Sequence, residues 1–105
     1  MEKLIYEYGP WDSQINIITK NPIIVGVVGS GNLEVLFESK NLDGKTIVYI
    51  ETSVDGFSNT WSAVMKDFTD QYQFSNTLIT INDGGATPAV VQLRLSQAAH
   101  LWSEK

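Results

Sequence analysis

The spacing of the apolar residues changes from a period of two to a period of 3.6 near residue 57, so the fold must combine strands with helices. Before the change, residues 23–29 (IIVGVVG) are a β-branched run, residues 33–38 (LEVLFE) alternate, and residues 45–52 (KTIVYIET) are rich in β-formers. Residues 3–8 alternate weakly and predict an edge strand. Ser30-Gly31-Asn32 between two strand signals predicts a hairpin turn.

Two helices are predicted, one on each side of a strand at 77–81. Over residues 59–70 the apolar side chains recur at helical spacing, and Ser58 or Asn59 is available as the N-cap. Thr87-Pro88 predicts a second helix start, with Thr as the N-cap and Pro in the first helical position. A stripe then continues to the C-terminus, although residues 91–95 also alternate as in a strand. Its members are Val91, Leu95, Ala98 and Trp102.

The order β-β-β-α-β-α, with a possible extra strand in front, predicts an α+β fold of a single domain, residues 1–105. We expect a two-layer sandwich: a mixed β-sheet of about four to five strands with two helices on one face. Residues 9–22 are expected to form a loop, with a short extended piece at 15–18. A crossover through helix 59–70 makes strand 77–81 parallel to 45–52. Ser30, loops 53–57 and 82–87 and both helix N-termini then share one end of the sheet.

Composition excludes several classes of protein. Twelve acidic against seven basic residues leave a net charge of −5 with no basic stripe, which excludes a nucleic-acid binder. No apolar run approaches the roughly 18 residues of a membrane span. The absence of cysteine excludes disulfides, thiolate metal sites and a cysteine nucleophile. Together with an N-terminus unlike a signal peptide, it predicts a cytoplasmic protein.

Ser30 stands between Gly29 and Gly31, so its hydroxyl is expected to project from a hairpin tip; the alternative is an ordinary turn serine. A nucleophilic role needs a base, and His100, the single histidine, is predicted at the far end of the second helix. No metal-ligand set is apparent. A dinucleotide fingerprint fails because Glu34 stands at its third glycine and a strand follows. A small phosphoryl- or acyl-transfer enzyme therefore lacks a convincing base or metal.

Three tracts carry a resemblance to a known family. They are VGVVGSGNLEVLFE (25–38), TSVDG (52–56) and INDGGATPAVVQLRLSQA (81–98). In matching order and spacing they resemble the acyl carrier, or delta, subunit of malonate decarboxylase. The resemblance covers most of the chain from residue 23 onward. The family commonly has Asp where this chain has Asn32, and many members read Asp-Phe-Gly-Ala-Thr-Pro where residues 83–88 are DGGATP.

The resemblance implies a carrier that is not itself an enzyme. Ser30, flanked by Gly29, Gly31 and Asn32, would be joined through a phosphodiester to 2′-(5″-phosphoribosyl)-3′-dephospho-CoA, whose thiol carries acetyl and malonyl groups. The implied partners are the transferase and decarboxylase subunits of malonate decarboxylase, a malonyl transferase and the prosthetic-group transferase. No catalytic or metal-binding residue is implied.

Glu34, Asp83 and Thr87 are further candidates for contact with the arm or with partners. Helix N-termini stabilise anions, and the predicted topology brings Thr87 to the Ser30 end. Two other functions stay open: an unmodified adaptor or assembly subunit, and the related acyl carrier of citrate lyase. The Gly-Ser-Gly hairpin and the Ala-Thr-Pro tract favour the malonate system.

Overall fold

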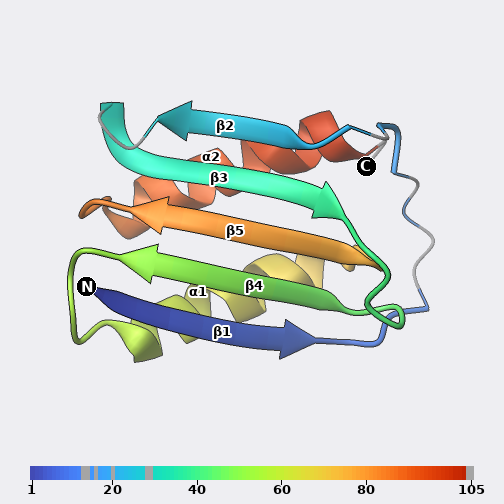
Figure 1. Cartoon of the computed structure of the whole chain (residues 1–105), viewed down its shortest axis with the longest axis horizontal. Helices are drawn as coiled ribbons and strands as arrows, with labels where there is room; N and C mark the ends of the chain where they lie inside the picture. The colour runs from blue at the N-terminus through green and yellow to red at the C-terminus, as the bar shows by residue number, and fades with distance from the viewer. Residues whose placement is uncertain (13–14, 16, 20, 28–29, 104–105) are drawn as a thin grey trace.

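The fold is a five-stranded sheet with two helices on one face (Figure 1). The computed structural model describes residues 1–12, 15, 17–19, 21–27 and 30–103, and of residues 27, 30 and 31 the backbone alone. The strands lie in the order β1-β4-β5-β3-β2. They are β1 (Glu2–Tyr8), β2 (Ile23–Val27), β3 (Ser30–Ser39), β4 (Thr46–Thr52) and β5 (Thr77–Asp83); the helices are α1 (Ser58–Gln71) and α2 (Pro88–Trp102).

The strand directions agree with those expected. β4 and β5 are parallel, and the pairs β1·β4, β2·β3 and β3·β5 are antiparallel, so the predicted mixed sheet and the α+β class are confirmed. The possible strand in front is present as β1, at one edge of the sheet. β5 lies between β3 and β4, so these two consecutive strands run antiparallel without pairing with each other.

One face of the sheet and the inner stripes of the helices form the core. In β4 and β5 every second residue is buried, as the period of two requires. The helices contribute buried residues at the predicted spacings, among them Trp61, Met65, Leu95 and Trp102. The ring of Phe37 meets three other aromatic rings edge to face, with centroids 5.9–6.2 Å apart: Phe68, Phe74 and Trp102.

The two helices begin in different ways. Thr87 caps α2, and its side-chain oxygen accepts a hydrogen bond from the Val90 N–H at 3.3 Å. This confirms the predicted start and makes the strand alternative for 91–95 wrong. The predicted cap of α1 is wrong: its N-cap is Phe57, with no side-chain cap bond, and Ser58 is the first helical residue. Tertiary contact fixes this end instead, because the Tyr6 hydroxyl donates to the Ser58 carbonyl at 2.9 Å.

Two predicted turns are shorter than expected. Ser30, Gly31 and Asn32 belong to β3, so the reading of them as the turn is wrong, and Gly29 lies outside the described residues. The irregularity sits in the partner strand, where the pairing with β3 shifts between Val25 and Val27. Gly26 there has φ +81°, and a Cβ on it would lie 2.4 Å from the Leu33 carbonyl oxygen, so only glycine fits. Likewise, residues 82 and 83, expected in a loop, complete β5.

The segment 9–22 is a loop, as predicted. Within its described residues, the strand-like pairing consists of an isolated bridge from Ile17 to Ser103, in place of the expected extended piece at 15–18. The Ile18 N–H donates to the Trp102 carbonyl at 3.0 Å, which ties the loop to the end of α2. Among the helices in the described ranges, none is both long and apolar enough to cross a membrane.

Candidate functional site at the Ser30 end of the sheet

One end of the sheet, here called the Ser30 end, gathers the segments that the strand directions predict there. β3 begins at Ser30, β4 ends at Thr52 and β5 ends at Asp83, all on the left in Figure 1. Two backbone hydrogen bonds tie the segments together: Gly84 N–H donates to the Asn32 carbonyl at 2.8 Å, and the Ser53 N–H donates to the Asp83 carbonyl at 3.0 Å. The predicted convergence of Ser30 with both loops is therefore confirmed.

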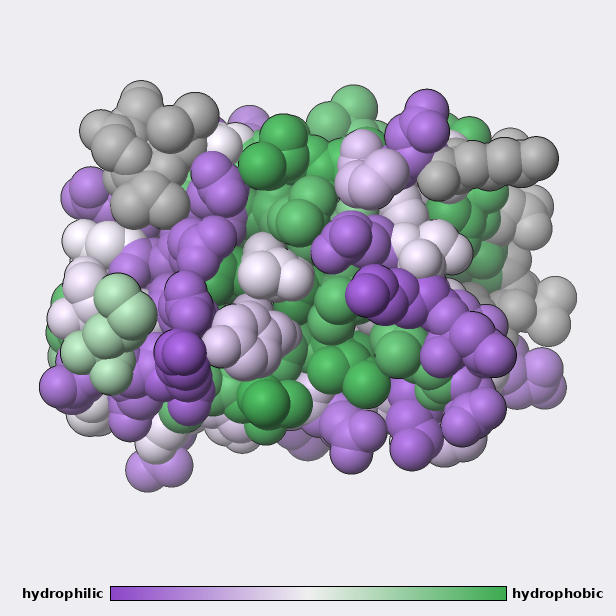
Figure 2. All heavy atoms as spheres, in the orientation of Figure 1, coloured by the Kyte–Doolittle hydropathy of each residue, from purple (hydrophilic) through white to green (hydrophobic). Residues whose placement is uncertain are grey.

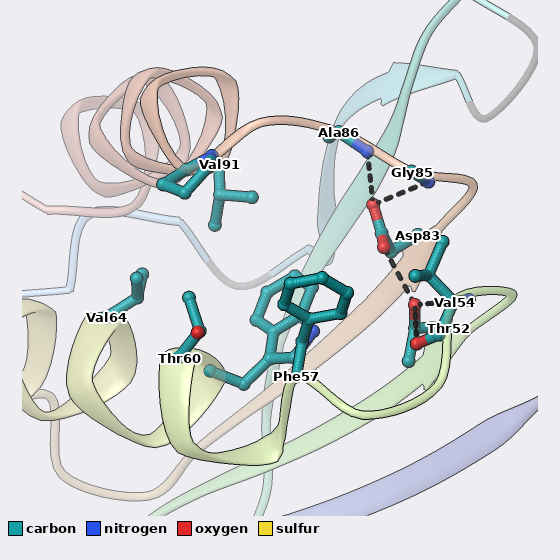
Figure 3. Close-up of a pocket in the computed structure, with 11 residues that line it drawn as sticks. Thr52, Val54, Phe57, Thr60, Val64, Asp83, Gly85, Ala86 and Val91 are labelled. Atoms are coloured by element: carbon teal, nitrogen blue, oxygen red, sulfur yellow. Dashed lines mark hydrogen bonds between the residues drawn. The ribbon is translucent and has the colours of Figure 1, made fainter.

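Asp83 is the buried polar centre of this end. One carboxylate oxygen accepts from the Thr52 hydroxyl at 2.8 Å, and the other accepts from the backbone N–H groups of Gly85 at 3.1 Å and Ala86 at 2.8 Å (Figure 3). The side chain thus closes the turn between β5 and α2 and joins it to the end of β4. Asp83 therefore sets where α2 begins relative to the sheet.

A pocket of about 370 Å³ opens beside Asp83, between the first turns of the two helices and the sheet. We call it the edge pocket (Figure 3). Its floor and walls are mainly apolar, and the side chains of Val54 and Phe57 are 36% and 51% exposed. It is lined by Thr52, Val54, Phe57, Thr60, Trp61, Val64, Asp83, Gly85, Ala86, Pro88 and Val91.

The start of α1 forms one wall of the edge pocket. Burial raises the pKa of Tyr6, and the charge of Glu2 raises it further. The phenol of Tyr6 therefore stays protonated at neutral pH and can keep donating to the Ser58 carbonyl. This contact holds the first turn of α1 against β1, which positions the neighbouring Phe57 at the pocket.

The other predicted site residues are placed as follows. Glu34 is half-buried on the sheet face that the helices leave open, and its carboxylate accepts from the Asn82 amide at 3.4 Å. Thr87 is exposed at the start of α2. Asn32 is exposed with φ 60°. His100 is exposed in the last turn of α2, at the opposite end from Ser30, as expected. Within the described ranges, no cluster of His, Asp or Glu could hold a metal ion.

Sequence reasoning missed the edge pocket and the place of Arg94, the chain's single arginine. Arg94 lies on α2 against β2: its Nε is 3.0 Å from where a Cβ on Gly26 would be. The sequence did carry a signal that Arg94 lies close to the sheet, because this residue falls at the border of the helical stripe, between Val91 and Leu95. The pocket had no comparable signal, since its walls come from segments far apart in the chain.

The open face of the sheet carries an apolar band, visible as the central green region of Figure 2. Cross-strand register places Ile5 opposite Tyr49 and Ile24 opposite Leu36, with Thr80 between Tyr49 and Leu36. Ile5 and Ile24 are 66% and 57% exposed. The two strongly exposed isoleucines thus lie on the two edge strands of this face.

Comparison with known proteins decides the family. Residues 20–101 match the family model of the malonate decarboxylase delta subunit. The chain belongs to this family. Within it, the chain is 42% identical over 102 residues to the malonate decarboxylase acyl carrier protein of Acinetobacter calcoaceticus, covering 97% of both chains. It is 51% identical over 78 residues to that of Stenotrophomonas maltophilia (strain R551-3), covering 74% of both.

A solved structure shares the fold of this family member. It is a Pseudomonas malonate decarboxylase hetero-tetramer in complex with malonate. One of its chains superposes with a TM-score of 0.78 at 39% identity, over 95% of this chain and 97% of that one. This coverage of 95% of the chain is wider than the range 20–101 that the family model matches.

Proposed function

We propose that this protein is the acyl carrier subunit of a malonate decarboxylase, with Ser30 as the attachment point of a CoA-derived arm. The observation that carries the proposal is the position of Ser30. It opens β3 at a free end of the sheet, next to the edge strand β2, inside the region that matches the family. The core lies between the sheet and the helices, so a large group joined at this end of the sheet need not displace it.

The proposed arm is 2′-(5″-phosphoribosyl)-3′-dephospho-CoA, joined to Ser30 by a phosphodiester. When bound, it supplies a thiol that carries acetyl and malonyl groups as thioesters. The residues of the Ser30 end fit such a group because the edge pocket offers apolar walls on the same end of the sheet. This observation does not require the chain to carry out a reaction itself.

The role proposed for the chain is presentation, not catalysis. His100, the one histidine, lies at the far end of α2, so it cannot act as a base for Ser30. A tethered acyl group is kept at an effective concentration of about millimolar for successive active sites. Those sites belong, in this proposal, to the transferase and decarboxylase subunits. The exposed isoleucines of the open face support assembly with another subunit, and the Pseudomonas chain that shares the fold belongs to a hetero-tetramer.

The test is to produce the protein together with the enzymes that make and transfer the arm, then measure its intact mass and map the peptide covering residues 21–40. We expect the mass of the arm on Ser30. Ser30→Ala should abolish the modification and leave the free energy of unfolding within about 0.5 kcal/mol, because it removes a single hydroxyl at the first residue of β3.

Ser39→Ala is the matched control, because Ser39 closes the same strand that Ser30 opens and is exposed. It should be modified like the wild type. A modification that persists in Ser30→Ala would refute the assignment of the site. An unmodified wild-type protein, in a host that loads other carriers of this type, would favour the adaptor function instead.

A further inference from the structure

The edge pocket has a size and a position that suit a bound ligand. Its volume of about 370 Å³ lies within the range of roughly 300–1,000 Å³ that is usual for small-molecule sites. Val54 and Phe57 are exposed beside it, although apolar side chains at a loop and a helix start gain nothing from contact with water. Asp83 and Thr52 satisfy each other by a hydrogen bond, so they leave the remaining wall apolar.

The pocket lies within reach of a group attached at Ser30. Leu33 pairs with Asp83, which lines the pocket, and Ser30 precedes Leu33 by three residues, or about 10 Å of strand. The pantetheine part of a CoA-derived arm alone has more than ten bonds in series, which span roughly 15 Å when extended. The end of the arm can therefore enter the pocket while its other end stays joined to Ser30.

We infer that the edge pocket shelters the acetyl end of the arm and leaves the malonyl end in solvent. This inference rests on the proposed function. An acetyl thioester is neutral and apolar, so its methyl group and the adjoining methylenes gain by leaving water for walls such as Val64, Val91 and Phe57.

The malonyl group carries a carboxylate, for which the pocket is the wrong environment. The residues that line the pocket include no lysine, arginine or histidine, and the charge present is the carboxylate of Asp83. The first turns of both helices also face the pocket, but the attraction of a helix N-terminus for an anion is smaller than the cost of burying a carboxylate without a cationic side chain and beside another anion. Replacing acetyl by malonyl on the arm would then release its end from the carrier, which presents the malonyl group to the decarboxylating subunit and protects the acetyl group from water.

The experiment uses the loaded protein, whose arm is first verified by intact mass. Acetyl and malonyl forms are treated with hydroxylamine, and each cleavage rate is divided by that of acetyl-CoA or malonyl-CoA, which removes the intrinsic difference in reactivity. A pocket occupied about 70–90% of the time protects about three- to tenfold. We expect this protection for the acetyl form, and a rate close to that of the free thioester for the malonyl form.

Two variants in α1 test whether the protection of the acetyl form comes from the edge pocket. Thr60 lines the pocket and Ser62 does not, and both side chains are exposed on the same helix. Thr60→Trp should fill the pocket and raise the acetyl cleavage rate to that of acetyl-CoA, whereas Ser62→Trp should keep the protection. In the wild type, a ¹³C-labelled acetyl methyl should show nuclear Overhauser contacts to the methyl groups of Val64 and Val91. This last measurement needs no variant to fold.

The possible failures are distinguishable. If the arm is absent from Ser30, the proposed function fails and this inference fails with it. If the arm is present but the acetyl form is cleaved as fast as acetyl-CoA, the inference alone is overturned. Equal protection of the malonyl form, or equal loss of protection in Thr60→Trp and Ser62→Trp, overturns it as well.

Discussion

The two ends of the sheet are built differently. At the Ser30 end the loops carry exposed apolar side chains, Val54 and Phe57, and a Cβ on Gly56 would meet nothing within 4 Å. At the opposite end, here called the Asn76 end, residues 40–46, 73–77 and Trp11 form a continuous polar network over an aromatic cluster. A Cβ on Gly44, at the Asn76 end, would lie 3.4 Å from the side chain of Pro10, so this glycine is packed where Gly56 is open.

The Asn76 end is fixed by side chains that bond to distant backbone groups. The Asn76 amide oxygen accepts from the N–H groups of Leu42 and Gly44, both at 2.9 Å. The Trp11 indole donates to the Thr46 hydroxyl at 3.0 Å, and that hydroxyl donates in turn to the carbonyl of residue 74 at 2.7 Å. Beneath this network lie the buried rings of the core.

The difference between the two ends shows how a small domain can present a mobile group. Local stability varies across a structure, and segments with few buried contacts open at low cost. Concentrating the fixed contacts at the Asn76 end lets the Ser30 end keep an open pocket and exposed loops. Substitutions at the two ends should therefore separate stability from the handling of the arm.

The largest expected effect is at the aromatic cluster. Phe37 is fully buried and meets Phe68, Phe74 and Trp102 edge to face. Phe37→Ala should lower the free energy of unfolding by about 3–5 kcal/mol, because it removes these contacts and leaves a cavity. Urea unfolding measures the change. If arm attachment is still complete well below the unfolding midpoint, the two ends are independent; a loss of attachment in the folded variant would contradict this.

The next largest effect is at Asn76. Asn76→Ala removes the acceptor of two half-buried N–H groups and places alanine at φ 54°, so we expect a loss of about 2–4 kcal/mol. Asn76→Gly is the control, since glycine tolerates this φ but also lacks the acceptor. Thermal unfolding should rank the wild type first, then Asn76→Gly, then Asn76→Ala. Equal stability of the two variants would mean that backbone strain plays no part.

The next prediction concerns Asp83, which lies at the Ser30 end itself. In the wild type the Thr52 hydroxyl donates to one carboxylate oxygen of Asp83. In Asp83→Asn the amide oxygen can still accept from the N–H groups of Gly85 and Ala86, but the amide N–H₂ must then face the Thr52 hydroxyl. Replacing these charge-assisted bonds by neutral ones should cost about 1–2 kcal/mol.

A double-mutant cycle separates the two contacts of Asp83. Thr52→Val removes the hydroxyl while keeping the side-chain shape, so Asp83→Asn should cost less in its presence. Equal costs in both backgrounds would show that the carboxylate acts through the loop N–H groups and not through Thr52. Hydrogen exchange of the Gly85 and Ala86 amides measures directly how strongly these two N–H groups are held.

The sequence predicted what depends on local spacing. The alternation of Leu33, Val35 and Phe37 and the Thr87-Pro88 helix start are signals within a few residues, and both are confirmed. The order of the strands in the sheet was not predicted, because pairing of β5 with β3 and β4 joins segments far apart in the chain. The start of α1 at Phe57 depends on contact between Tyr6 and Ser58, which no local pattern reveals.

In the candidate site, too, the sequence predicted local features and not those that depend on contacts between distant segments. Ser30 could be singled out because Gly-Ser-Gly between two strand signals is a local feature. Asp83 was singled out but expected in a loop, since Asn, Asp and Gly usually mark turns. Its place in β5 comes from pairing with Leu33 and Thr52. The edge pocket could not be foreseen, because it exists only where the first turns of α1 and α2 come together.

The smallest expected effect concerns Thr87, which caps α2 next to the edge pocket. Thr87→Ala should lower stability by about 1 kcal/mol, because the Val90 N–H loses its side-chain acceptor, and Thr87→Ser should restore it. The rate of arm attachment distinguishes two roles for this exposed hydroxyl. If Thr87 acts only as a cap, Thr87→Val attaches the arm at the wild-type rate at temperatures where both are folded. If Thr87 also contacts the arm or its transferase, Thr87→Val attaches the arm more slowly and Thr87→Ser does not. The second result would give Thr87 two roles at the Ser30 end: a cap that contributes about 1 kcal/mol to stability, and a residue that the arm or its transferase recognises.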